Sequence, residues 1–143
     1  MRIQLLLLGK TRRAEIRSLL DDYAARLRRF AEIEIRELRE DSPASMRRLE
    51  LAPGATLTLL DAGGKQFDSS QFASWIAGCR DRGVRDIVFL CGAAEGFPAA
   101  ISGRATKRIS LSSMTFSHEL ARVMLVEQLY RAFALLAGHP YPK

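Results

Sequence analysis

The chain has 143 residues and a mass of 16.0 kDa, enough for one domain with a hydrophobic core of its own. Hydrophobic residues make up 48% and charged residues 27%, which argues against disorder, and no apolar run approaches the ~20 residues of a membrane-spanning helix. The formal net charge of +6 favours an anionic partner, with nucleic acid the leading candidate. Arginine faces that are simply solvated are the alternative.

The two cysteines, Cys79 and Cys91, stand in no metal-binding or redox spacing, so we expect reduced packing residues and no metal. The first apolar run, residues 3–8, stops at Gly9 and lacks a cleavage region, unlike an export signal. We therefore expect a cytoplasmic protein.

Strands and helices are predicted to alternate along the chain. In chain order we expect a strand over 3–8, a helix over 14–30, an edge strand over 33–38, a short helix over 44–51, a strand over 56–61 that exits through 62–64, a helix capped by Ser69 or Ser70 and closed by Gly83, a strand over 86–91, a short helix over 98–104, a strand over 107–111, and a long helix over 118–137. The strands are continuously apolar rather than alternating. This order and pattern predict an α/β fold, one domain over residues 1–143, with a mostly parallel sheet covered by helices on both faces.

Ligands of such folds gather at the carboxyl ends of the strands. Three strand ends here run into loops with polar or glycine-rich chemistry: residues 60–64, 91–96 and 111–117. We expect them to converge on one cleft lined by backbone amides and carbonyls, suited to a nucleoside-type ligand. The chain carries neither a Walker loop nor a dinucleotide-binding fingerprint.

Within this cleft, Gly92 and Gly96 would let the backbone approach a flat ligand closely, but by themselves they are weak evidence for a site, and an ordinary strand-to-helix turn is the alternative. Glu95 between them could accept hydrogen bonds from ligand hydroxyls or cap the next helix. Backbone groups of residues 111–116 are expected to hold an adenine edge, with Leu60 closing the same pocket.

The long C-terminal helix begins at the cleft. Ser117 is a plausible N-cap, and the positive end of the helix dipole favours anionic ligands. His118 at its start is a candidate for chemistry or simply a solvated helix-start residue. The apolar flank of this helix is too wide for one core face, so part of it either packs on a second subunit or is buried within the chain.

Taken together, the motifs resemble the RlmH family (also called YbeA) of knotted SPOUT-class methyltransferases, over essentially all 143 residues. The segments that carry the resemblance are the helix motif 22–27, the strand exit 60–65, the turn 92–96, the loop 111–116 with His118 and Arg122, the helix 127–132, and the tail 139–141.

The resemblance implies a SPOUT fold with a C-terminal trefoil knot and a homodimer whose active site lies at the subunit interface. It implies S-adenosylmethionine as methyl donor, and N3 of a pseudouridine in helix 69 of 23S ribosomal RNA as target. The residues that match the donor pocket of the family are Leu60, Gly92, Leu111, Ser112, Ser113, Met114, Thr115 and Phe116. Arg122 and Tyr141 fall where the target RNA would approach, and His118 is the candidate catalytic residue.

The chain departs from the family pattern at two positions. Ala93 stands where the family often has glycine, and Pro142 stands where it usually has a histidine after the tyrosine. Proline cannot accept a proton, so a base role at that position does not carry over. Two other functions remain open: a SPOUT methyltransferase for another RNA, or a catalytically silent, ribosome-associated RNA-binding module.

Overall fold

The computed structural model describes residues 1–39, 43–92 and 97–141. One sheet with strand order β2-β1-β4-β3-β5 forms its centre, and each pairing in this sheet is parallel. The strands are β1 (Arg2–Leu8), β2 (Glu32–Leu38), β3 (Thr56–Gln66), β4 (Asp86–Cys91) and β5 (Lys107–Ser110). The parallel sheet and the edge position of β2 are as predicted.

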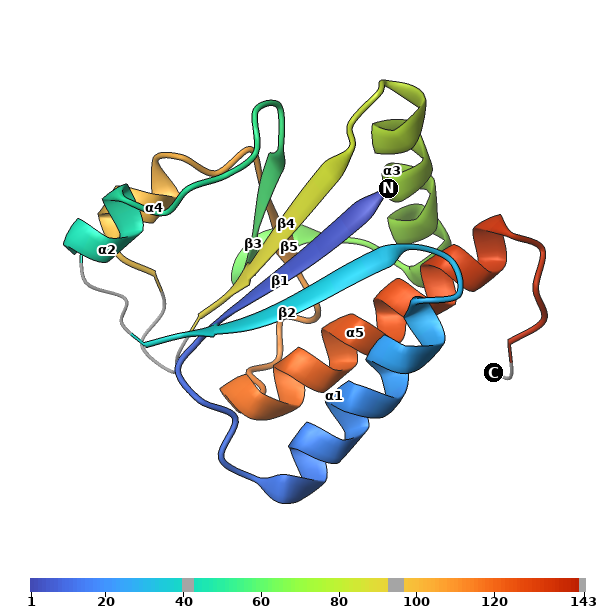
Figure 1. The fold of residues 1–143 in the computed structure, drawn as a ribbon, viewed down its shortest axis with the longest axis horizontal. Coiled ribbons are helices and arrows are strands. Elements are labelled where there is room, and N and C mark those ends of the chain that lie inside the picture. The colour runs from blue at the N-terminus through green and yellow to red at the C-terminus, as the bar shows by residue number, and fades with distance from the viewer. Residues whose placement is uncertain (40–42, 93–96, 142–143) are drawn as a thin grey trace.

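Helices cover both faces of the sheet (Figure 1). Three of them, α1 (Ala14–Leu27), α3 (Ser69–Asp81) and α5 (His118–Leu136), pack together on one face. On the other face α2 (Pro43–Arg47) packs against α4 (Ala99–Ser102). The predicted α/β class is confirmed. Among the described residues, no helix combines the length and apolarity needed to cross a membrane.

The central strands are apolar at nearly every position because both of their faces are buried. In β1, Ile3, Leu5 and Leu7 belong to the core beneath α1, α3 and α5. The alternate residues Leu6 and Leu8 belong to the core beneath α2 and α4. Side chains of a strand point alternately to opposite faces, so a strand covered twice needs an unbroken apolar run.

Several helix ends differ from the predictions. The helix α1 ends at Leu27 rather than Phe30, and both α2 and α4 are shorter than expected. Asp68, not Ser69 or Ser70, caps α3: its carboxylate accepts from Gln71 N at 2.7 Å, and Gln71 Oε1 accepts from Asp68 N at 2.9 Å. This reciprocal pair is a capping box, which satisfies two backbone donors at the start of the helix.

The predicted exit of β3 after Asp61 is wrong, because the strand continues to Gln66 through an irregularity. Both Leu60 and Lys65 pair with Ile109 of β5, so the intervening residues bulge out of the ladder. A Cβ at Gly64 would lie 2.7 Å from the carbonyl carbon of Arg108 and 2.8 Å from Ile109 N. Only glycine lets β3 return to β5 at this distance.

We therefore expect Gly64→Ala to push β3 away from β5 and to lower the free energy of unfolding by about 1–3 kcal/mol, as overpacking usually does. Gly63→Ala is the matched control, because its Cβ would meet only Asp61 Oδ1 at 3.7 Å. Urea denaturation of both variants measures the difference. Equal stabilities would contradict this account of the bulge.

Candidate active site

A cavity of about 550 Å³ opens at the carboxyl edge of the sheet. It lies among the bulge of β3, the end of β4, the segment that follows β5 and the first turn of α5. Its lining residues are Leu60, Asp61, Ala62, Cys91, Gly92, Phe97, Ser102, Arg108, Leu111, Ser112, Met114, Thr115, Phe116, Ser117, His118 and Ala121. We call this cavity the edge pocket.

Eight of the residues singled out from the sequence line the edge pocket: Leu60, Gly92, Leu111, Ser112, Met114, Thr115, Phe116 and His118. The three strand ends therefore converge as expected, the second of them through Cys91 and Gly92. Ser113 is exposed and does not contribute to the lining. Residues 93–96, with Glu95 and Gly96, lie outside the described residues, as does Pro142.

The segment after β5 is shaped by its own hydroxyl groups. Ser110 Oγ donates to the carbonyl of Ser112 at 2.9 Å, and Ser112 Oγ accepts from Met114 N at 3.0 Å. Ser117 Oγ accepts from Leu120 N at 3.3 Å, so the predicted N-cap of α5 is confirmed. These local bonds turn the chain from the sheet into the helix and leave other backbone groups of the loop for a ligand.

Two charged residues at the edge pocket were not singled out from the sequence. Arg108 Nη1 lies 3.1 Å from Asp61 Oδ2, which joins β5 to the bulge of β3. Asp61 belongs to the strand exit 60–64 that was expected at the cleft, but it was given no role of its own. No local sequence pattern marks Arg108 or Phe97, because their positions at the edge pocket depend on which strands become neighbours.

Arg122 was predicted to meet RNA, and its position contradicts that role for its side chain. The residue is fully buried, and its guanidinium donates to the carbonyls of Leu8 at 2.8 Å and Gly9 at 3.0 Å and to Thr11 Oγ1 at 2.8 Å. Burial lowers the pKa of this guanidinium, but arginine stays protonated at neutral pH. Arg122 thus fastens the chain after β1 to α5.

Tyr141 also lies away from the edge pocket of its own chain. Its ring packs on Tyr130 with centroids 4.8 Å apart, beneath the guanidinium of Arg131 at 4.4 Å, and its hydroxyl lies 3.3 Å from Glu127 Oε2. Burial is the main reason why the pKa of the Tyr141 hydroxyl lies well above its usual range, and the nearby Tyr23 and Glu127 raise this pKa further. Glu127 lies about 14 Å along α5 from His118.

Cys91 lines the edge pocket but is 2% exposed. Burial raises the pKa of its thiol to about 12, so the thiol is protonated at neutral pH and cannot act as a nucleophile. Among residues 1–39, 43–92 and 97–141, no three histidine, cysteine or acidic side chains gather as metal ligands would.

The raised pKa predicts that Cys91 resists alkylation by iodoacetamide at about pH 8 in the folded protein and reacts once the protein is unfolded in guanidinium. Because the folded pKa lies above the unfolded one, reactivity in the native state should rise only toward strongly alkaline pH. Peptide mass mapping distinguishes Cys91 from Cys79. Rapid native labelling of Cys91 near neutral pH would contradict the assignment.

Comparison with solved structures supports the fold. A methylase family protein from Haemophilus influenzae superposes with a TM-score of 0.54 at 9% identity, covering 99% of this chain and 72% of that chain. A methyltransferase from Legionella pneumophila, determined with bound SAM, superposes with a TM-score of 0.52 at 15% identity, covering 92% of this chain and 66% of that chain. Identities this low show the fold alone.

Sequence comparison goes further. The chain is 44% identical to ribosomal RNA large subunit methyltransferase H of Pelobacter propionicus, covering 99% of each chain. It is 42% identical to the protein of the same name from Geobacter sp. (strain M21), covering 99% of this chain and 98% of the relative. The family described as "Predicted SPOUT methyltransferase" matches residues 1–142. The chain belongs to this SPOUT methyltransferase family, together with the ribosomal RNA large subunit methyltransferase H proteins.

Proposed function

We propose that this protein uses S-adenosylmethionine to methylate N3 of a pseudouridine in helix 69 of 23S ribosomal RNA. The observation that carries the proposal is the edge pocket, which gathers the segments that resemble the donor site of the family. The ribosomal RNA methyltransferases at 42–44% identity support the substrate class. The nucleotide and its position rest on the family resemblance.

The residues present fit the methyl donor. The edge pocket, at about 550 Å³, has the size of pockets that hold nucleoside-sized ligands. Leu60, Leu111 and Phe116 offer apolar surface for a purine ring. Gly92 and the loop 112–116 offer backbone groups for its polar edge.

When bound, the donor supplies a methyl group on a sulfonium, which already has a good leaving group. The protein then has two tasks: to hold N3 in line with that methyl group, and to remove the N3 proton. His118 is half-buried in the lining of the edge pocket, at the first position of α5. It accepts the N3 proton in this proposal, directly or through a water.

The active protein in this proposal is a homodimer, in the cytoplasm, with its active site at the subunit interface. Because Tyr141 is remote from the edge pocket of its own chain, it can contact the target RNA at an active site only beside the pocket of a second chain. An apolar groove of about 510 Å³ between α1, α3 and α5, rimmed by the exposed Leu19 and Met124, supports such an interface. The trefoil knot stays a prediction of the family resemblance.

If His118 accepts the proton, His118→Ala should lower kcat at least ~100-fold, the usual share of a positioned general base, and change donor affinity little. Calorimetry with S-adenosylmethionine and single-turnover methylation of large ribosomal subunits measure the two effects. Added imidazole should restore part of the lost rate. An unchanged kcat would eliminate this role for His118.

The target is tested by mass mapping of helix 69 nucleotides from a strain that lacks the gene, before and after incubation of its ribosomes with the purified protein. The proposal predicts that one methyl group is missing from the strain and restored by the protein. A methyl group retained in the deletion strain would redirect the search to another RNA. A protein that does not bind S-adenosylmethionine would be a silent RNA-binding module instead.

A further inference from the structure

The connection between β1 and α1, residues 9–13, combines a firmly held backbone with exposed cations. Thr11 is buried at its centre, while the side chains of Lys10, Arg12 and Arg13 face solvent. We call this segment the basic loop. Its place at the carboxyl end of β1 puts it at the same edge of the sheet as the edge pocket.

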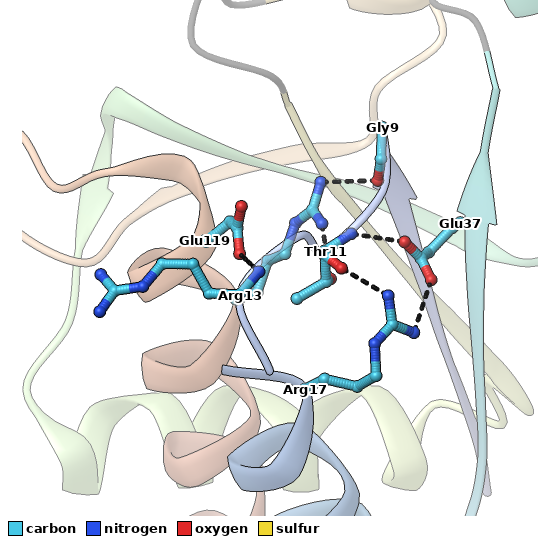
Figure 2. A network of polar contacts seen from close by, with 7 residues as sticks. Gly9, Thr11, Arg13, Arg17, Glu37 and Glu119 are labelled. Carbon is cyan, nitrogen blue, oxygen red and sulfur yellow. Dashed lines mark hydrogen bonds and ion pairs between the residues drawn. The ribbon is translucent and has the colours of Figure 1, made fainter. Parts of the chain in front are cut away.

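Side chains from three elements hold the backbone of the basic loop (Figure 2). Glu119 of α5 accepts from Arg13 N at 3.1 Å, and Glu37 of β2 accepts from Thr11 N at 2.5 Å. Arg17 of α1 donates to the carbonyl of Thr11 and lies 3.4 Å from Glu37 Oε1. The hydrogen bond from Arg13 N also lowers the pKa of Glu119, which keeps this carboxylate charged.

Arg122 adds the deepest contact. Its three hydrogen bonds go to neutral oxygens, it has no ion pair in the described part of the chain, and its buried Nε lacks a partner there. Glu37 and Glu119 lie near enough to favour the charged form of Arg122, but burial has the larger effect and lowers its pKa, so the guanidinium is held here at a net electrostatic cost. Gly9, at φ +91°, begins the turn directly against it.

The exposed cations of the loop are left without comparable partners. Within residues 1–39, 43–92 and 97–141, neither Lys10 nor Arg12 forms an ion pair, and Arg13 only meets the exposed Glu15 at 3.7 Å. A rigid backbone that presents free cations suits phosphate oxygens, because little conformational entropy is lost on binding.

The first turn of α5 supports both sites. His118 and Ala121, three residues apart, line the edge pocket, whereas Glu119 and Arg122, also three apart, hold the basic loop. Residues at this spacing share one face of a helix. A shift of the basic loop relative to the edge pocket would therefore require α5 itself to move.

We propose that the basic loop binds phosphates of the RNA strand next to the target nucleotide, and that Arg122 and Glu119 are positioning residues that set its distance from the edge pocket. The inference rests on the proposed RNA substrate and adds where that RNA is gripped. It gives the buried Arg122, which forms no direct ion pair with the other described residues, a function that packing alone does not require.

The double variant Lys10→Ala/Arg12→Ala tests the phosphate contacts. Large ribosomal subunits from the deletion strain are the probe, with filter binding at several salt concentrations. Loss of two contacts should raise Kd roughly tenfold at ~0.1 M salt and reduce the slope of log K against log salt by about 1.5. The control variant Arg28→Ala/Arg29→Ala removes two exposed cations at the other end of α1. It should leave Kd within about twofold of the wild-type value and the slope close to the wild-type slope.

The outcomes separate the two proposals. If the wild-type protein neither binds nor methylates the subunits, both the proposed function and this inference fail. If it binds and methylates them but the two double variants behave alike, only the basic loop is wrong.

The positioning role is tested with Arg122→Met, which keeps the volume and removes the donors, and with Thr11→Val, which removes only one acceptor. Both variants should raise KM for large ribosomal subunits and reduce the slope of log K against log salt, although every exposed cation remains. The effects of Thr11→Val should be the smaller ones, and neither variant should change the affinity for S-adenosylmethionine. Each effect should largely disappear when Lys10 and Arg12 are already alanine. Effects that add fully to those of the double variant would show general destabilisation and overturn the role.

Discussion

Each strand pairing in the described sheet is parallel, and this constraint places the carboxyl ends of β1, β3, β4 and β5 at one edge. The helices α1 and α5 begin at the same edge and run back along the sheet (Figure 1). Segments that lie far apart in the sequence therefore meet at this edge of the sheet. The edge pocket and the basic loop both follow from this topology.

The buried Arg122 turns this meeting of segments into a defined geometry. It joins α5 to the turn after β1 through oxygens of Leu8, Gly9 and Thr11, more than a hundred residues away in sequence. The adjacent turn of α5 carries His118 into the edge pocket. The N-terminal end of α5 thus sets the distance between His118, the proposed proton acceptor, and the basic loop, the proposed RNA contact.

The sequence predicted the order of elements, the parallel sheet and the convergence of three strand ends, because apolar runs, caps and glycine turns are local signals. It failed where a position depends on a distant partner. The continuation of β3 to Gln66 requires β5 as its neighbour, and the burial of Arg122 requires the turn after β1. The Asp68–Gln71 capping box was a local signal that the preference for a serine cap overlooked.

The central claim is that the methyl donor lies in the edge pocket, against Leu60, Gly92 and the loop 111–116. A crystal structure of the protein with S-adenosylmethionine tests it most directly. We expect electron density for the purine between Leu60 and Leu111, with the methyl group facing the side of the pocket where His118 lies. Density for the donor in the groove between α1, α3 and α5, with an empty edge pocket, would contradict the account.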